Sequence, residues 1–148
     1  MTLEEKIVQT LQDQGVEFEI HEHAPVYTNP TMATALGVSE AETVKSLVLA
    51  TKEKTMVVLV LPGNKKVDWK AAARTANTKK VSFAKPEAVS AAVGCEVGCV
   101  PPFGHFTRLP IYMDAELLQQ AYVYFNPGVH HKSFKVRSRD LQKLCWAG

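Results

Sequence analysis

The sequence predicts an α+β fold, a single domain over residues 1–148 in which helices pack on a mixed, mostly antiparallel sheet. Segments with helical and with strand-like spacing follow each other without the regular alternation that parallel α/β sheets require. Two strand-like runs, Thr43–Thr51 and Thr55–Leu61, are separated only by Lys52–Lys54, which is too short for a crossover and favours an antiparallel hairpin. No repeat or linker divides the 148 residues, a length that fits one domain with its own core.

The helix predictions rest on apolar spacing and on residues that begin or end helices. Leu3, Ile7 and Leu11 recur at helical spacing, and Gly15 stands where such a helix would end. The other predicted helices are Thr31–Leu36 before Gly37, a helix from the N-cap Asp68 to Ala76, Pro86–Val93, a turn capped by Asp114, and a final helix capped by Ser138 that contains Leu141 and Leu144.

The strand predictions rest on alternation and on β-branched or aromatic residues. Val16, Phe18 and Ile20 alternate with acids and predict a first strand. Beyond the hairpin, the other predicted strands are Lys80–Ala84, Ile111–Met113, Tyr122–Phe125 and Phe134–Val136. Two segments are expected to be irregular, namely His21–Pro30 and the stretch Gly94–Gly104, which is rich in Gly, Pro and Cys.

The amino-acid composition limits the classes of function that this chain can have. Apolar residues make up 46% and charged residues 22% of the sequence, the balance of a globular rather than a disordered chain. The formal net charge of +2 is too small to imply nucleic-acid binding by electrostatics alone, although it does not exclude a transient nucleic-acid substrate. Lysines are frequent in the middle third of the sequence, where we expect them in solvated turns. If they lay on one side of the protein, they could hold an acceptor stem through its phosphates. These lysines are Lys52, Lys54, Lys65, Lys66, Lys70, Lys79 and Lys80.

Cysteine usage and the N-terminus point to the cytoplasm. The three cysteines, Cys95, Cys99 and Cys145, make no even disulfide framework, so a reducing compartment is expected. The chain begins with acids where a secretory signal needs basic and then apolar residues. The longest apolar run, Met56–Leu61, is far shorter than the roughly 20 residues that span a bilayer. We therefore expect a cytoplasmic protein with no membrane partner.

Lys45 is the first residue whose placement points to chemistry. In the predicted strand Thr43–Thr51 it shares one face with Leu47 and Leu49, which have the pattern of core residues. A lysine beside an apolar face must reach water, an acid or a ligand, because an unpaired buried ammonium is very costly. From the pattern alone, a packed stem with its ammonium in solvent explains Lys45 more readily than a functional site does.

The segment Gly98–Gly104, with the sequence Gly-Cys-Val-Pro-Pro-Phe-Gly, is the second such feature. Two prolines between two glycines predict a stiff loop whose backbone can approach a ligand closely. Such a loop can direct several N–H and C=O groups at one point, which suits a small polar substrate or a developing oxyanion. A rigid connection between two elements explains the same residues equally well.

Histidines and cysteines raise two further hypotheses, a metal site and a Cys–His nucleophile. Cys95 and Cys99 have one nearby histidine, His105, but lack the paired spacing typical of zinc motifs. Cys99 and His105 could form a nucleophilic pair, yet no flanking signature supports it. The sequence also has no dinucleotide, Walker or nucleophile-elbow motif. We expect no metal and no cofactor.

Five ordered motifs resemble those of the YbaK/prolyl-tRNA synthetase editing-domain family, and the resemblance covers almost the whole chain. They are His23–Thr28, similar to the family's His-Pro-Pro-Val-x-Thr loop; Val44–Leu49, similar to its central strand with the characteristic lysine; Leu61–Gly63 with Val67 and Asp68; Gly98–Gly104, similar to its Gly-x-x-x-Pro loop; and Asn126–Gly128, a late turn. Ala24 departs from the family pattern, where a second proline is frequent, and the late turn is not the Gly-Ala-Gly type of many members.

The resemblance implies a trans-acting aminoacyl-tRNA deacylase that hydrolyses the ester of mischarged tRNA carrying a small amino acid such as Ala, Ser, Thr or Cys. Its partners would be mischarged aminoacyl-tRNA and, as a second candidate, an aminoacyl-tRNA synthetase. The alternative function is a tRNA- or nucleotide-binding accessory module of a synthetase complex, without catalysis. Intact Lys45 and Gly98–Gly104 motifs favour the enzyme.

The resemblance also implies the site. Lys45 would be the catalytic residue, either stabilising charge near the ester or positioning the ribose or a phosphate. Because no side chain is a compelling general base, the substrate's ribose hydroxyl or a backbone carbonyl would activate the water. The implied substrate-binding residues are Thr28, Ser46, Gly98, Cys99, Val100, Pro101, Pro102, Phe103, Gly104, Asn126, Gly128 and His130.

Overall fold

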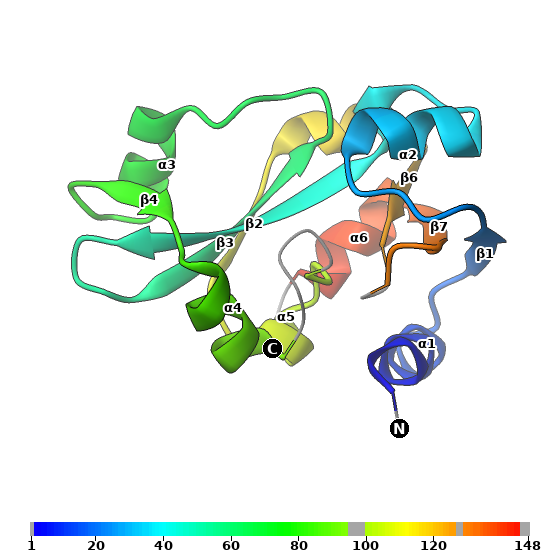
Figure 1. Ribbon diagram of the computed structural model, residues 1–148, viewed down its shortest axis with the longest axis horizontal. Coiled ribbons are helices and arrows are strands. Elements are labelled where there is room, and N and C mark those ends of the chain that lie inside the picture. The colour runs from blue at the N-terminus through cyan, green and yellow to red at the C-terminus, as the bar shows by residue number, and fades with distance from the viewer. Residues whose placement is uncertain (1, 95–99, 127–128, 146–148) are drawn as a thin grey trace.

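Two β-sheets of unequal size form the frame of the computed structural model, which describes residues 2–94, 100–126 and 129–145 (Figure 1). The strands are β1 (Phe18–Glu22), β2 (Val44–Thr51), β3 (Met56–Pro62), β4 (Val81–Phe83), β5 (Ile111–Met113), β6 (Tyr122–Phe125) and β7 (Lys132–Arg137). The smaller sheet has the order β1-β7-β6 and is antiparallel. The larger has the order β4-β2-β3-β5, with the pair β3–β5 parallel and its other pairs antiparallel.

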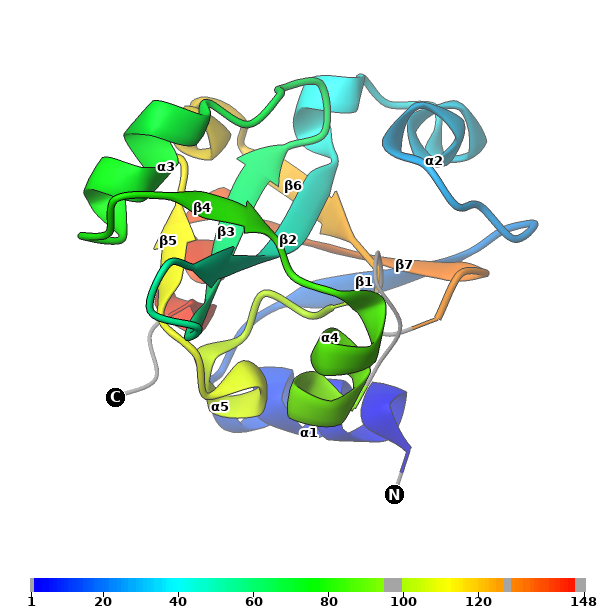
Figure 2. The same ribbon diagram turned by 60° about the vertical axis from the view of Figure 1, so that its left-hand side comes forward.

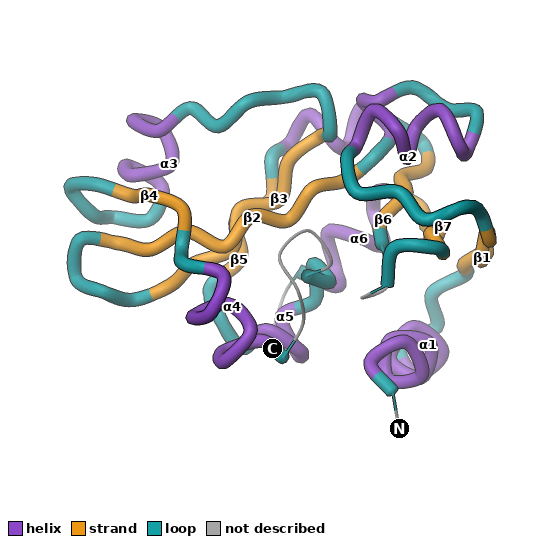
Figure 3. Tube along the Cα trace, viewed as in Figure 1, coloured by secondary structure: helices purple, strands orange, loops and turns teal. Residues whose placement is uncertain are grey.

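Helices surround the two sheets on several sides (Figure 2). They are α1 (Leu3–Asp13), α2 (Asn29–Leu36), the 3-10 helix η1 (Glu40–Glu42), α3 (Trp69–Thr75), α4 (Pro86–Val93), α5 (Gly104–Thr107), the 3-10 helix η2 (Ala115–Gln119) and α6 (Ser138–Leu144). Figure 3 shows that a long loop, residues 63–68, carries the chain from β3 to α3. None of the helices in the described ranges is long and apolar enough to cross a membrane.

Capping residues fix the ends of α2 and α3, and two of them, Asp68 and Gly37, are the ones that the sequence predicts. The Asp68 carboxylate accepts a hydrogen bond from the Ala71 N–H at 3.0 Å and begins α3. Gly37 ends α2 with a φ of 71°, a left-handed conformation that glycine adopts without steric cost. Thr28 caps the N-terminus of α2 by accepting from the Thr31 N–H at 3.3 Å.

The larger sheet is covered on both faces, because alternate residues of its strands point to two different cores. Val48 pairs with Val58 on the face that meets the smaller sheet, whereas Leu49 pairs with Val57 on the face beneath α3. The first core also takes in residues of the smaller sheet, α1 and α6, namely Ile7, Leu11, Val123, Phe125, Phe134, Val136, Leu141 and Leu144. The second contains Ala72, Ala73 and Val81.

A buried junction at Thr43 joins the two sheets and α2. Thr43 forms a parallel bridge with Tyr124 of β6, and its side chain is fully buried. The Asn29 side-chain amide donates to the Thr43 hydroxyl at 3.0 Å and to the Val44 carbonyl at 3.3 Å. The Gly63 N–H donates to the Thr43 carbonyl at 2.8 Å. Four separate segments therefore meet where β2 begins.

The predicted α+β fold is confirmed, with the predicted mixed sheet divided into two. α2 begins at Asn29 rather than Thr31, because Thr28 is its cap. Gly104 is not irregular but begins α5, where its carbonyl accepts from the Arg108 N–H at 3.0 Å. Ser138 is not a cap: it is the first helical residue of α6, and its hydroxyl donates to the Gln120 carbonyl at 2.6 Å.

Substitution of Gly63 by alanine is expected to destabilise the junction by about 1–3 kcal/mol, because a Cβ there would overlap the Thr43 hydroxyl and the Asn29 side chain. Denaturant unfolding of Gly63→Ala measures the loss. Asn64→Ala, an exposed neighbour in the same turn, is the control and should change the unfolding free energy by less than about 0.5 kcal/mol. Equal stability of both variants would contradict the packing role of Gly63.

Candidate active site

A pocket of about 240 Å³ lies at the edge of β2 that β4 leaves uncovered. β4 pairs with β2 only at residues 49–51 and the chain then turns into α4. The pocket is lined by Ser46, Leu47, Val48, Phe83, Ala84, Pro86, Val89 and Val100. Most of these side chains are apolar, and Ser46 supplies a hydroxyl. The pocket therefore combines an apolar wall with polar groups at one strand edge.

Pro86 explains why the edge of β2 stays open. The Leu49–Phe83 register, continued backwards, places Pro86 opposite Ser46, and proline has no N–H to donate to a strand partner. The last bond across this edge runs from the Ala84 N–H to the Val48 carbonyl at 3.0 Å. Because alternate residues direct their backbone groups to the same edge, the Ser46 N–H and C=O also point this way. They have no strand partner there among the described residues.

Lys45 lies on the opposite face of β2 from Ser46. It is half-buried, pairs with Leu61 of β3, and shares its face with Leu47 and with Leu49, which is 1% exposed, as the sequence predicts. Burial lowers the pKa of the Lys45 ammonium, and the negative charge of Glu40 partly opposes this by raising it. Within the described parts of the chain, the ammonium makes no hydrogen bond and no ion pair.

The described part of the predicted glycine loop is mostly buried. Val100 belongs to the first core and also lines the pocket beside Ser46. The Phe103 ring is fully buried and meets the Phe125 ring edge-on at 5.4 Å. Pro101, Pro102 and Gly104 are also buried, so this part of the loop packs inside the protein rather than facing solvent. The predicted residues Gly98 and Cys99 lie outside the described residues.

A second group of polar residues lies where the His21–Pro30 segment meets the turn after β6. His23 Nε2 is 2.8 Å from the Ser133 hydroxyl, which donates to the Asn126 side-chain carbonyl at 3.5 Å. The His130 ring lies 4.4 Å from that of Tyr27, and its Nδ1 is 3.2 Å from the Val26 carbonyl. Asn126 and His130 therefore lie near the Thr28 segment; Gly128 lies outside the described residues.

β6 connects this polar group to the start of β2. Tyr124 and Phe125 of β6 contact Thr43 and Phe103, and Asn126, which directly follows the strand, contacts Ser133. The structure thus brings the predicted residues to two places, the edge pocket with Ser46 and Val100, and the polar group with Asn126 and His130. Lys45 precedes Ser46 on β2, facing away from the first core.

Comparison with known proteins assigns this chain to a family. A family model described as the aminoacyl-tRNA editing domain matches residues 23–144, which contain every residue of the pocket and the polar group. The chain belongs to the aminoacyl-tRNA editing domain family. The family predicted from the sequence motifs is therefore confirmed.

Two curated relatives of this editing-domain chain are named as deacylases. The multifunctional Ser/Thr-tRNA deacylase ProXp-y of Escherichia coli O157:H7 is 23% identical over 145 residues, which cover 95% of this chain and 87% of the relative. EbsC of Enterococcus faecalis, named as a proposed Cys-tRNA(Pro)/Cys-tRNA(Cys) deacylase, is 29% identical over 98 residues, which cover 66% of this chain and 60% of the relative.

A solved structure supports the fold. The crystal structure of a protein proposed to be a trans-editing enzyme for prolyl-tRNA synthetase has a TM-score of 0.86 and 27% sequence identity to this chain. The alignment covers 100% of this chain and 94% of the other.

The described residues of this editing domain offer neither a metal cluster nor an activated thiol. They contain no group of three or more His, Cys, Asp or Glu side chains placed to hold a metal ion. Burial raises the pKa of the Cys145 thiol to about 12, so this thiol stays protonated and unreactive at neutral pH. Cys99, the nucleophile of the Cys–His hypothesis, lies outside the described residues.

Sequence reasoning missed Asn29 and Pro86 as residues that shape the site. Asn29 was expected in a loop, yet its side-chain amide donates to Thr43 and Val44, the two residues that precede Lys45. The available signal was the Thr28-Asn29-Pro30 run, in which an N-cap residue is followed by a proline at the first helical turn. Pro86 was expected only to start a helix, and its strand register could not be known before β4 was placed.

The Lys45 ammonium is expected to titrate below the usual lysine range, and Glu40→Gln should lower its pKa further by removing the charge that raises it. NMR titration of the lysine side chains measures both. Lys65 serves as an internal reference, because its hydrogen bond to Asp114 raises its pKa. Glu42→Gln, on the same 3-10 turn, is the matched control and should leave the Lys45 midpoint unchanged. A midpoint above that of Lys65 would contradict the burial of Lys45.

Proposed function

We propose that this chain is a trans-acting aminoacyl-tRNA deacylase that hydrolyses the ester of tRNA mischarged with a small amino acid, in the class of Ala, Ser, Thr and Cys. The observation that carries the proposal is the edge pocket, which Ser46 and Val100 both line. These two residues belong to two of the motifs that resemble the family's, and Lys45 directly precedes Ser46 on β2. Residues 1–148 act as one editing domain, because Ile7 and Leu11 of α1 pack into the core that both sheets share.

The size of the pocket favours a small amino acid. A volume of about 240 Å³ is below the roughly 300–1,000 Å³ of pockets that enclose drug-sized ligands. Its apolar wall, with Val48, Val89 and Val100, suits a short side chain, while the Ser46 backbone can bind the polar atoms of an amino acid. The names of the two relatives, a Ser/Thr-tRNA and a Cys-tRNA deacylase, support this substrate class.

Hydrolysis then requires attack by water and stabilisation of the developing negative charge. The water oxygen bonds to the ester carbonyl carbon, whose C=O electron pair moves onto oxygen; the bond from carbon to the ribose oxygen then breaks. The water gives up a proton and the leaving ribose oxygen takes one. In the proposed mechanism, the Lys45 ammonium stabilises the oxyanion or holds the ribose or phosphate in place.

The Ser46 carbonyl is our candidate for the backbone group that orients the water. It points to the open edge, where Pro86 has no N–H to bond it. His23 and His130 are less suitable as bases, because His23 Nε2 already faces Ser133 and His130 Nδ1 already faces Val26. The ribose hydroxyl next to the ester completes the proton transfer in this scheme.

Lys45→Met should lower the rate constant for deacylation by about 100-fold or more, because the variant keeps much of the apolar stem and removes the charge. A panel of tRNAs mischarged with Ala, Ser, Thr and Cys, with thermal unfolding of each variant, measures the effect. Lys6→Met, an exposed lysine on α1, is the control and should keep the wild-type rate.

Two outcomes would overturn the assignment. A folded Lys45→Met protein with the wild-type rate and unchanged substrate binding would remove Lys45 from the mechanism. Wild-type protein that binds every tRNA of the panel and hydrolyses none would favour the accessory binding module.

Ser46→Ala should lower kcat/KM for seryl and threonyl esters about 5-fold relative to the alanyl ester, because one hydrogen bond to a substrate hydroxyl is worth about 1 kcal/mol. The ratio of the rates on matched tRNAs measures this preference. The alanyl ester is the internal control, since the backbone groups of Ser46 remain. An unchanged ratio would show that another group recognises the substrate hydroxyl.

A further inference from the structure

A second hollow, of about 440 Å³, lies on the outer side of α3 and β4 and carries two exposed aromatic rings. Trp69 is 40% exposed and Phe83 is 61% exposed, and the rings meet edge-on at 5.0 Å between centroids. Large aromatic side chains in solvent are unusual unless they contact a partner. We call this hollow the aromatic groove; its other lining residues include Lys70, Lys79 and Lys80.

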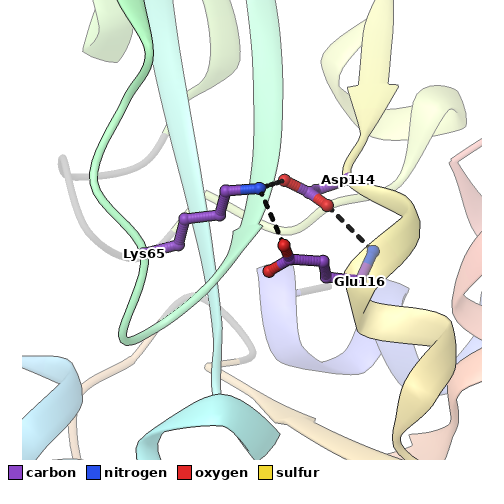
Figure 4. A network of polar contacts seen from close by, with 3 residues as sticks. All are labelled: Lys65, Asp114 and Glu116. Atoms are coloured by element: carbon purple, nitrogen blue, oxygen red, sulfur yellow. Dashed lines mark hydrogen bonds and ion pairs between the residues drawn. The ribbon is translucent and has the colours of Figure 1, made fainter.

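The lysines of the aromatic groove are free to bind an anion. Lys70, Lys79 and Lys80 form no ion pair within the described ranges, and no acid lines the groove there. The nearby Glu53 carboxylate accepts from the Thr78 hydroxyl at 2.7 Å. By contrast, Lys65 is held by Asp114 at 2.7 Å and by Glu116 at 3.3 Å (Figure 4).

The aromatic groove adjoins the edge pocket. Phe83 is a lining residue of both hollows, so a ligand that occupied both would pass this residue. Figures 1 and 2 show β4 running from α3 towards α4. The groove is lined by residues of α3 and β4, and the pocket by residues of β2, the end of β4 and α4. A chain molecule that places its end group in the pocket would therefore lay its preceding units along the groove.

We infer that the aromatic groove binds the single-stranded 3′ end of the tRNA, with a base stacked on Trp69 or Phe83 and phosphates at Lys70, Lys79 and Lys80. This inference rests on the proposed deacylase function. Exposed aromatic rings beside lysines are the usual means of holding single-stranded nucleic acid, because every base has a face that stacks and every unit carries a phosphate. The aminoacyl ester, attached to the terminal ribose, then enters the edge pocket.

The local arrangement accounts for nucleic-acid binding by a chain whose net charge is only +2. Binding in this arrangement does not depend on the overall charge, because three unpaired lysines gather beside the rings while other lysines are neutralised by acids. A protein partner would use the same rings as apolar anchors, but the described lining of the groove contains three lysines and no acid, which favours an anionic ligand.

The test uses uncharged tRNA minihelices with an intact or a truncated single-stranded 3′ end, in fluorescence anisotropy titrations at several salt concentrations. Trp69→Leu should weaken binding of the intact minihelix by about 5- to 100-fold and leave the truncated one unchanged. Tyr122→Leu, an exposed aromatic residue on β6 and 40% exposed, is the matched control. Trp69 is the preferred variant because Phe83 also lines the edge pocket.

The lysines give an independent readout. Each of Lys79→Gln and Lys80→Gln should reduce the slope of log affinity against log salt by about 0.7, the value for one phosphate contact with a single strand. Lys6→Gln on α1, which Figure 1 shows at the other end of the molecule, should leave the slope unchanged. Deacylation by Trp69→Leu at saturating substrate should stay at the wild-type rate, with a raised KM.

The outcomes separate this inference from the proposed function. If wild-type protein hydrolyses mischarged tRNA and Trp69→Leu binds both minihelices normally, the proposed RNA-binding role of the groove is wrong and the deacylase function stands. Equal binding of the intact and truncated minihelices by wild-type protein would also contradict the role of the groove. Loss of synthetase binding in Trp69→Leu, with minihelix binding unchanged, would assign the groove to a protein partner. Absence of hydrolysis in wild type, with the expected minihelix results, would overturn only the deacylase.

Discussion

The extent of pairing between β4 and β2 determines where the edge pocket lies. The two strands bond only over residues 49–51 of β2, and the chain then leaves the sheet for α4. Pro86 fixes that departure: it cannot donate a strand hydrogen bond opposite Ser46, and it suits the first turn of a helix. A longer β4 would cover the Ser46 backbone and fill the space that the edge pocket occupies. An unpaired stretch of strand edge, elsewhere a liability in proteins, here borders a cavity.

The same constraint places the surrounding groups. α3 covers the far face of the sheet with Ala72 and Ala73, so its bulky Trp69 is left outside, where it meets Phe83. Phe83 is the last residue of β4, at the point where the strand leaves β2, and so it borders both hollows. At the other end of the open edge, the Thr43 junction fixes the first residues of β2. Lys45 therefore stands on a rigid base, although its own ammonium has no partner within the described residues.

Local patterns in the sequence were enough to predict most elements, and they failed where distant segments meet. Capping and alternation predicted α3, the hairpin and the face that Lys45 occupies. Ser138 looks locally like a cap, yet the Gln120 carbonyl takes its hydroxyl, a contact across 18 positions that no local pattern contains. His23 and Ser133 are 110 positions apart. The edge pocket depends on the register of β4 against β2, which spacing along one strand cannot reveal; the family motifs pointed to Ser46 and Val100 without it.

In the proposed binding mode, the local placement of charge matters more than the net charge of +2 that composition gives. Several lysines are neutralised in place: Lys132 lies 2.9 Å from Glu4, and Lys135 lies 3.2 Å from Glu19 and over the Tyr122 ring. The acids of these pairs neutralise Lys132 and Lys135 locally, whereas no acid lines the groove in which Lys70, Lys79 and Lys80 lie beside Trp69. The groove can then supply affinity common to any tRNA end, because stacking and phosphate contacts do not depend on the amino acid. Discrimination is left to the edge pocket, where a methyl or hydroxyl group changes binding by about 1–3 kcal/mol. A fold that divides recognition in this way can change the amino acid it removes by altering a few pocket residues, while its hold on the tRNA end stays the same.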